Sequence, residues 1–236
     1  MAKLQTPVLF STHFKVSSAA INNAGLIDPF VNVDTELFID PILLEKSSDR
    51  RISEGALSAF KQHFSDFIRL LTISGREGDA AWKAARNLLD LSEPPYNGLG
   101  YGGTGNSGSS RPEEVRLAIM RTSKEIIELG SKDPEMISLM GFFEENVGPD
   151  TISDFTTRTI VDQLAEITEG FCNKQKIPTQ ETQLSSKFKL PVFVNSKGLS
   201  SPIVLIPKDI VRDLQSPTAG AMWNPPFLKT STSAKR

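Results

Sequence analysis

The sequence predicts an α+β fold, a helix-rich domain in which five or six helices pack on a small sheet, with a C-terminal β-hairpin extension. Three observations support this prediction. Several long segments carry apolar residues at spacings of three and four, the pattern of amphipathic helices. Short β-rich runs separated by turn residues occur near residues 190 and 205. Hydrophobic residues make up 39% of the 236 residues and charged residues 23%, as in folded globular domains.

Two strands are expected in the first forty residues. Residues 8–16 alternate loosely between apolar and polar side chains, and residues 31–39 form a second β-rich run. The Asn-Asn-Ala-Gly stretch at residues 22–25 is a turn signal between them.

Two helices are predicted before residue 90. Residues 52–71 carry an apolar stripe formed by Ile52, Ala56, Phe60, Phe64, Phe67 and Leu71. Residues 79–89 predict a shorter helix that is buried through Trp82 and Leu88.

Three further helix starts follow residue 110. Ser110 and Glu113 stand at capping-box spacing, and the helix they open ends near Gly130. Its apolar face is expected to consist of Val115, Ile119, Ile126 and Leu129. The Asp-Pro step at residues 133–134 predicts an N-cap and a first helical residue. Residues 153–154 are the third start, and the apolar face of that helix comprises Ile160, Leu164, Ile167 and Phe171.

The C-terminal quarter has a different pattern. Residues 190–194 and 202–207 are short β-rich runs on either side of an Asn-Ser-Lys-Gly turn, which predicts a hairpin. Residues 208–214 predict a last short helix. No periodicity remains from residue 215 onward.

The charge is unevenly distributed and divides the chain into two expected domains. Residues 1–177, which include a glycine-rich loop at 96–110, hold 18 Lys and Arg against 25 Asp and Glu, a net charge of −7. Residues 178–236 hold 8 against 3, a net charge of +5, and the two values sum to −2. The sequence therefore predicts an acidic, mainly helical domain and a basic hairpin extension with a loose tail. The basic part is interpreted either as a contact surface or as a solvated terminus.

An acidic segment predicts a magnesium site. If residues 34–40 form a strand, Asp34, Glu36 and Asp40 lie on one face, because side chains alternate along a strand. Asp150 and Asp154 would complete the set of carboxylates that a hard cation such as Mg²⁺ requires. The alternative is structural: Asp40 and Asp154 are N-caps, and Asp34 and Glu36 face water.

A magnesium site of this kind would suit phosphodiester hydrolysis. Restriction-endonuclease-like enzymes combine an aspartate with a Glu-x-Lys or Asp-x-Lys spacing on a neighbouring strand, and this spacing is absent from the sequence. Its nearest form, Glu114-x-Arg116, falls on a predicted helix, which argues against a nuclease.

The glycine loop contains Gly-x-Gly-x-x-Gly at residues 103–108, followed by a helix. No hydrophobic strand enters the loop and no Walker lysine follows it, which argues against a dinucleotide or P-loop fold. Two interpretations stay open: a phosphate or nucleic-acid contact that involves Arg111, and a flexible connector.

Basic residues surround the predicted hairpin and predict phosphate binding. They are Lys187, Lys189, Lys197, Lys208 and Arg212. Phe188 and Phe193 would either stack on bases or belong to the core.

Cysteine and histidine usage excludes several kinds of site. The single cysteine, Cys172, excludes an internal disulfide and is expected to be buried and inert. His13 and His63 stand in no zinc-binding spacing. The start of the chain lacks the apolar core of a signal peptide, and no apolar run reaches the roughly 20 residues that span a bilayer. We therefore expect a cytoplasmic protein without a membrane contact.

Three short stretches carry a family resemblance. They are Leu-Phe-Ile-Asp-Pro at 37–41, Val-Gly-Pro-Asp-Thr-Ile-Ser-Asp at 147–154 and Val-Leu-Ile-Pro-Lys-Asp at 204–209. In this order they resemble segments of longer uncharacterised bacterial proteins of defence or mobile islands, over most of residues 26–214. The resemblance implies a nucleic-acid-related role and assigns no catalytic residue. Because the last stretch resembles the middle of those chains, it also implies a shortened version.

Three functions are therefore expected as alternatives. The first is a nucleic-acid-associated bacterial protein, in particular a Mg²⁺-dependent phosphodiesterase or nuclease of a defence system. The second is a non-catalytic binding or regulatory subunit that uses the basic hairpin region on nucleic acid or a protein. The third is a fragment that pairs with a partner protein or forms an oligomer.

Overall fold

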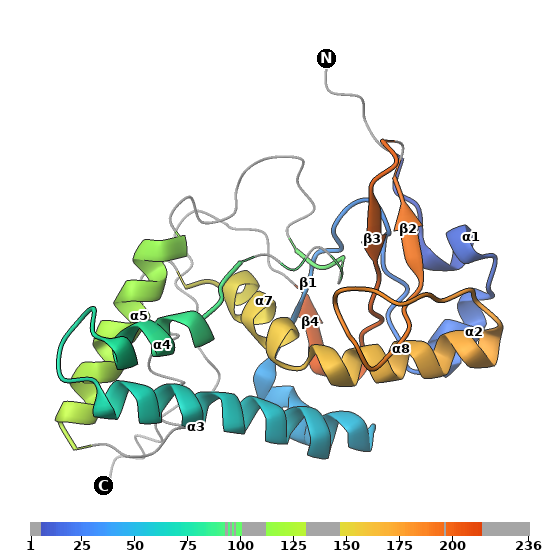
Figure 1. The fold of residues 1–236 in the computed structure, drawn as a ribbon. Coiled ribbons are helices and arrows are strands. Elements are labelled where there is room, and N and C mark those ends of the chain that lie inside the picture. The colour runs from blue at the N-terminus through green and yellow to red at the C-terminus, as the bar shows by residue number, and fades with distance from the viewer. Residues whose placement is uncertain are drawn as a thin grey trace, which may run out of the picture.

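The structure is a computed structural model that describes residues 6–92, 94, 96, 98–100, 112–130, 147–195 and 197–213. Over these residues, helices combine with short strands that form two small antiparallel sheets, so the expected α+β fold is confirmed (Figure 1). None of the described helices is long and apolar enough to cross a membrane.

Helical elements make up most of the regular structure. In chain order they are α1 (Phe10–Phe14), α2 (Ser18–Asn23), the 3₁₀ helix η1 (Pro41–Lys46), the π-helix η2 (Arg51–Ala56), α3 (Leu57–Ile73), α4 (Ala80–Leu88), α5 (Pro112–Glu128), α7 (Pro149–Thr159), α8 (Val161–Gln175) and the 3₁₀ helix η3 (Lys208–Ile210). The strands are β1 (Leu37–Ile39), β2 (Val192–Val194), β3 (Ser200–Pro202) and β4 (Val211–Asp213).

The two helices predicted before residue 90 are confirmed. The first is η2 running directly into α3, and the second is α4. Asp79 is the N-cap of α4: its carboxylate accepts hydrogen bonds from the backbone N–H of Trp82 at 2.7 Å and of Gly75 at 2.9 Å. These bonds lower the pKa of Asp79 to about 2, and the bond from Trp82 is the largest cause. A carboxylate that accepts several amide hydrogen bonds favours its charged form, so the helix start is held by an ionised side chain.

The strand expected at residues 8–16 is wrong, because this segment forms the short helix α1 and the turn after it. The reason lies in residues 28–32. The Asp28 carboxylate accepts from the Ser11 N–H, and the Asn32 side-chain oxygen accepts from the Val8 N–H, both at 2.9 Å. Side chains thus satisfy backbone donors that a strand would have paired with another strand.

The helix start expected at residues 153–154 is also wrong. α7 begins four residues earlier at Pro149, with Gly148 as its N-cap, and a break at Ile160 separates it from α8. Proline at the first helical position lacks only an N–H that would have no helical partner there. The expected apolar face is confirmed, since its four residues, from Ile160 to Phe171, are all buried.

α5 begins at Pro112 and ends near Gly130 as expected, and Val115 and Ile119 are buried. Leu129 departs from the expected apolar face, because it is 88% exposed where the helix ends. The helix start expected at residues 133–134 lies outside the described residues.

The sheets are two-stranded. β1 pairs with β4, which joins Leu37 to Asp213 and Ile39 to Val211. β2 pairs with β3 as the predicted hairpin, but the bounds differ: β2 is shorter than the expected run 190–194, and β3 shares only Pro202 with the run expected at 202–207. The helix expected at residues 208–214 is only half right, since the 3₁₀ helix η3 passes directly into β4.

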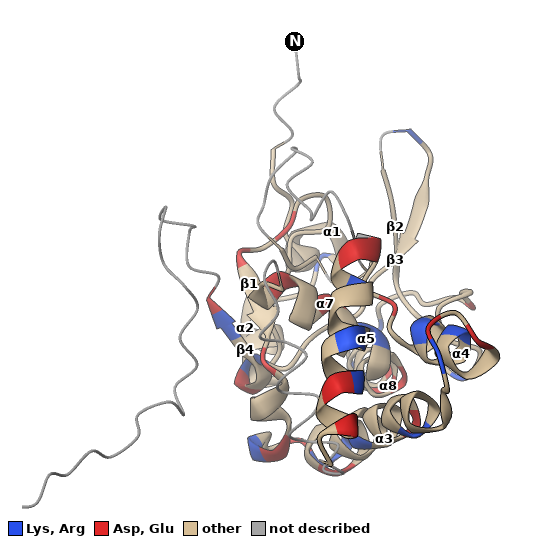
Figure 2. Ribbon diagram, turned by 90° about the vertical axis from the view of Figure 1, so that its left-hand side faces the viewer, with Lys and Arg blue, Asp and Glu red and all other residues tan. Residues whose placement is uncertain are grey.

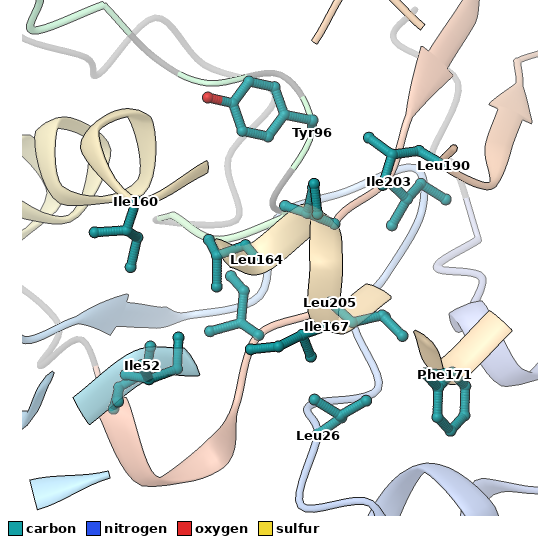
Figure 3. Close-up of a cluster of buried hydrophobic side chains, with 14 of the residues drawn as sticks. Leu26, Ile52, Tyr96, Ile160, Leu164, Ile167, Phe171, Leu190, Ile203 and Leu205 are labelled. Atoms are coloured by element: carbon teal, nitrogen blue, oxygen red, sulfur yellow. The ribbon is translucent and has the colours of Figure 1, made fainter. Parts of the chain in front are cut away.

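The main core lies around α8 (Figure 3). Its buried side chains come from the N-terminal elements, from α8 and from the segment that follows β3. Leu164 and Ile167 of α8 lie close to Leu205, with Leu26 beside them. Both sides of the expected domain boundary at residue 177 therefore contribute to one hydrophobic cluster.

A second cluster, the helical core, joins α3, α4, α5 and α7. Its central ring is Phe155 of α7, which lies 5.3 Å from the ring of Phe64 and 6.2 Å from that of Phe60, both on α3. Trp82 of α4 and Met120 of α5 are buried in the same cluster. Lys124 of α5 adds a polar link, because its ammonium group donates to the carbonyl oxygens at the end of α3.

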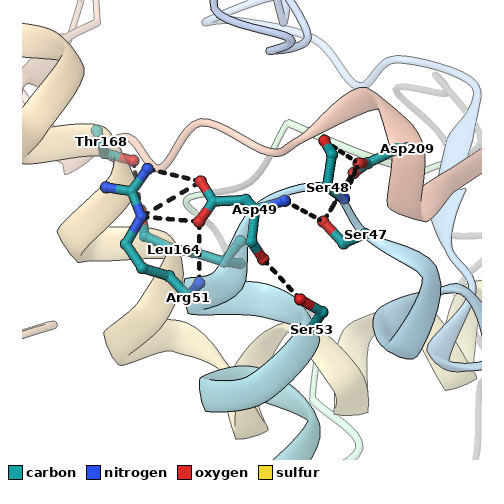
Figure 4. A network of polar contacts seen from close by, with 8 residues as sticks. All are labelled: Ser47, Ser48, Asp49, Arg51, Ser53, Leu164, Thr168 and Asp209. Atoms are coloured by element: carbon teal, nitrogen blue, oxygen red, sulfur yellow. Dashed lines mark hydrogen bonds and ion pairs between the residues drawn. The ribbon is translucent and has the colours of Figure 1, made fainter.

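A polar junction fixes the end of η1 to η3 (Figure 4). The Asp209 carboxylate accepts hydrogen bonds from the backbone N–H of Ser48 at 2.8 Å and from its hydroxyl at 2.9 Å. It also accepts from the hydroxyl of the buried Ser47. Next to this junction, Asp49 and Arg51 form an ion pair of 2.6 Å. The junction ties residues that are more than 160 positions apart in the sequence.

Candidate functional site

The acidic segment lies beside the start of the glycine-rich loop. Thr35 and Leu99 form a parallel bridge, and the Gly100 N–H donates to the Thr35 carbonyl at 3.0 Å. A Cβ on Gly100 would lie only 3.3 Å from the Asp34 carboxylate, and the residue has a φ of +145°. Glycine is therefore needed where this loop approaches Asp34. Glu36, two residues further, is exposed.

Asp40 has two partners within the protein. It is the N-cap of η1, accepting from the Ile42 N–H at 3.0 Å, and it accepts from Arg212 Nε of β4 at 2.5 Å. The cap interpretation is thus confirmed for this residue. Because Asp40 is buried, the ion pair is less screened by water than a surface pair would be.

β1 packs against α7, which brings the acidic segment to the two distant aspartates. The Ile39 N–H donates to Ser153 Oγ at 3.0 Å. Ser153 lies in α7 between Asp150, in the first turn, and the buried Asp154. Asp154 is thus inside a helix and is not the expected N-cap.

β1 and α7 therefore lie together, although the five predicted carboxylates do not form a metal-binding group. Within the described ranges, no group of three or more His, Cys, Asp or Glu side chains is arranged to hold a metal ion. The magnesium site at Asp34, Glu36, Asp40, Asp150 and Asp154 stays a prediction.

Sequence reasoning missed a group of charged residues next to Tyr96. Arg158 Nε donates to the Ser92 carbonyl at 2.8 Å, and its guanidinium lies 3.5 Å from Asp90. Burial raises the pKa of Tyr96 to about 12. The charge of Arg158 lowers this pKa, and the charges of Asp154 and Asp90 raise it. No spacing in the sequence signals this group, because its members come from two separate segments, residues 90–96 and α7.

Arg116 of α5 is the basic residue of Glu114-x-Arg116, the nearest form of the nuclease spacing. It lies on a helix as expected, where it pairs with Glu113 at 3.1 Å. Glu113 in turn binds Arg86 of α4 at 2.7 Å. These contacts tie α4 to α5.

Most of the predicted phosphate-binding residues have partners in the protein. Lys187 pairs with Asp162 of α8 at 2.7 Å, and this hydrogen bond raises the pKa of Lys187. Lys189 lies 3.9 Å from Glu181. Arg212 binds Asp40, and the Lys208 ammonium binds the Asn22 side chain. Arg111 lies outside the described residues.

Lys197 has a different setting, because it is exposed and lies in the turn between β2 and β3. Figure 2 shows basic colouring at the tip of this hairpin. The Asn195 side-chain oxygen accepts from the N–H of Lys197 at 2.9 Å and of Leu199 at 3.0 Å. The Asn195 carbonyl accepts from Gly198, whose φ of +76° suits glycine. These bonds order the turn that carries the lysine.

The hairpin is attached to the body by one face. Phe193 packs on the main core and lies 5.1 Å from the ring of His13, so the core interpretation of this phenylalanine is confirmed. Phe188 also packs on the main core. The hairpin rises from the body as a ribbon (Figures 1 and 2). The expected burial of Cys172 is confirmed as well, and this burial raises its thiol pKa to about 12.

Comparison with known proteins identifies the family. Residues 15–218 match a family described as a domain of unknown function (DUF8370), and the chain belongs to this family. No curated protein matches the chain. No solved structure matches it either.

Proposed function

We propose that this chain binds nucleic acid through the β2–β3 hairpin, as a non-catalytic binding or regulatory subunit. The observation that carries the proposal is the exposed lysine at the tip of this ribbon, Lys197, in a stretch of sequence without acidic residues. From residue 182 to residue 208 the sequence holds four lysines and no acidic residue, and Lys197 stands at the ordered tip. A projecting cation without neighbouring acids attracts a phosphate backbone.

The two lysines at the base of the hairpin support the same surface. The Lys187 and Lys189 side chains are 68% and 57% exposed although each has an acidic partner. Ion pairs between exposed groups contribute only about 0–1 kcal/mol. A phosphate can therefore replace Asp162 or Glu181 as partner with little loss.

The charge-reversing substitution Lys197→Glu tests this proposal. We expect it to weaken binding of a labelled duplex about tenfold and to reduce the slope of log K against log salt by about 1 unit, since one phosphate contact is lost. Fluorescence anisotropy at several salt concentrations measures both quantities.

Lys83→Glu is the matched control. Lys83 is an exposed lysine of α4, which lies away from the hairpin (Figure 1), and its substitution changes the net charge by the same amount. Equal weakening by the two substitutions would show a general charge effect and contradict a role of the hairpin. Absence of salt-dependent binding by the unmodified protein would reject the function itself.

A second candidate is a Mg²⁺-dependent phosphodiesterase or nuclease. The packing of β1 against α7 favours it, because the Ile39–Ser153 hydrogen bond brings the acidic segment to the helix of Asp150 and Asp154. In this proposal Asp34, Glu36 and the two α7 aspartates supply oxygen ligands. Asp40 can act as a ligand only if its ion pair with Arg212 breaks.

Isothermal titration with Mg²⁺ and Mn²⁺ tests the second candidate. We expect saturable binding that is lost in Asp150→Asn and retained in Asp66→Asn, because Asp66 lies on α3 and binds Arg69. If the folded protein takes up no metal, or if both variants bind equally, the phosphodiesterase proposal is rejected.

The biological setting of either candidate is also a proposal. The resemblance of residues 37–41, 147–154 and 204–209 supports a bacterial, cytoplasmic protein of a defence or mobile island. In such a setting a nucleic-acid-binding protein would meet foreign DNA or RNA.

A further inference from the structure

We infer that the nucleic acid bound by the hairpin is B-form duplex DNA, and that the ribbon enters its major groove. This inference rests on the proposed function and adds the class of ligand and the surface of the duplex that is read. Three features of the ribbon carry it: its shape, the side chains on its free face and the order of its tip.

The shape is that of a two-stranded antiparallel ribbon. β2 and β3 pair in register, from Val192 opposite Pro202 to Val194 opposite Ser200. Paired strands lie roughly 4.8 Å apart. A ribbon of this width with its side chains fits the major groove of B-DNA, which is about 12 Å wide. Ribbons of this kind read DNA in several folds.

The two faces of the ribbon differ. Because side chains alternate along a strand, Phe193 and Val194 point to opposite faces. Phe193 contacts His13 on the body, so Val194 and its cross-strand partner Ser200 belong to the free face. Val194 is 54% exposed, and Leu199 beside the tip is 64% exposed.

These free side chains match groups of the major groove. An apolar side chain contacts the C5 methyl group of thymine, and a serine hydroxyl bonds to either kind of base edge. Val194 and Leu199 are of the first kind and Ser200 is of the second. The exposed aliphatic side chains would thus contact thymine methyl groups. The absence of acidic residues from 182 to 208 avoids repulsion of the phosphates on both sides of the groove.

The order of the tip favours insertion. Asn195 accepts three backbone hydrogen bonds, from Lys197, Leu199 and Gly198. Its own N–H donates to the Leu199 carbonyl at 3.0 Å. A turn already held in this way loses little conformational freedom when it binds.

Other nucleic acids fit the ribbon less well. Single strands are bound by exposed aromatic rings on which bases stack. Phe193 is the one aromatic residue between residues 192 and 202, and it faces the body. The major groove of A-form RNA is too deep and narrow for side chains to read.

The test compares four labelled ligands of one sequence rich in A·T pairs, by anisotropy at fixed salt. They are duplex DNA, the same duplex with deoxyuridine in place of thymidine, duplex RNA and single-stranded DNA. We expect duplex DNA to bind about tenfold tighter than duplex RNA or single-stranded DNA. Loss of the thymine methyl groups is expected to weaken binding about threefold.

A double variant, Val194→Ser with Leu199→Ser, completes the experiment. Both side chains are exposed, so the fold is retained, and the variant should bind the thymidine and deoxyuridine duplexes equally. Equal binding of duplex DNA and duplex RNA, or a thymine effect that persists in the variant, would overturn the inference while leaving the proposed function intact. No binding to any of the four ligands would reject both.

Discussion

Replacing Phe155 by alanine is expected to lower the free energy of unfolding by about 3–5 kcal/mol. The ring is buried in the helical core, 5.3 Å from the rings of Phe64 and His63. Alanine would leave a cavity between α7 and α3 whose lining loses its contacts. Urea unfolding followed by circular dichroism measures the change.

The control for this prediction is Phe155→Leu. Leucine retains most of the apolar volume, so its loss of stability should be less than half of that of the alanine variant. A loss below about 1 kcal/mol in the alanine variant would contradict the placement of this ring at the centre of the helical core.

Replacing Thr168 by valine is expected to lower the free energy of unfolding by about 1–3 kcal/mol. Thr168 of α8 is fully buried; its hydroxyl accepts from the Leu205 N–H at 2.8 Å and donates to the Leu164 carbonyl at 2.7 Å. Valine fills the same space but leaves the Leu205 N–H buried without an acceptor. The same urea titration measures the effect.

Thr168→Ser separates the hydrogen bond from the packing. Serine keeps the hydroxyl and loses one methyl group, a loss of about 1 kcal/mol. If the serine variant is the less stable of the two, packing rather than the hydrogen bond to Leu205 holds this segment.

The helices α3, α4 and α5 were predictable because their signals are local. Asp79 at the start of α4, Pro112 at the start of α5 and the apolar spacing from residue 52 onward all act within a few residues. The hairpin was predictable for the same reason, since Asn195 and Gly198 make its turn.

The N-terminal strand prediction failed because distant side chains decide this segment. Ser11 bonds to Asp28, and the nine-residue strand expected up to Ile39 shrinks to Leu37–Ile39. Within that region, Thr35 pairs with Leu99 instead of extending β1. Neither contact can be predicted from hydrophobic periodicity, because each joins two segments that are distant in the sequence.

For the candidate site, the sequence showed which charged residues exist but not which of them are paired. Lys187 and Arg212 appeared equivalent to Lys197 in the sequence, yet the first two bind Asp162 and Asp40. The metal-site prediction required residues 34–40 to lie near Asp150 and Asp154. β1 and α7 do pack against each other, but no metal-holding group of three or more side chains is assembled among the described residues. The pairing of Asp40 with β4 had no signal, because 172 residues separate it from Arg212.

The placement of residues 203–213 has a consequence for synthesis on the ribosome. This segment supplies Leu205 to the main core, Asp209 to the polar junction and β4 to the sheet with β1. Its partners are translated far earlier. The apolar surface around α8 and the N-terminal helices therefore stays exposed on the nascent chain until residue 213 has emerged. Contacts of such long range form slowly. We therefore expect the unfinished chain to expose apolar surface that chaperones can bind until this segment is in place.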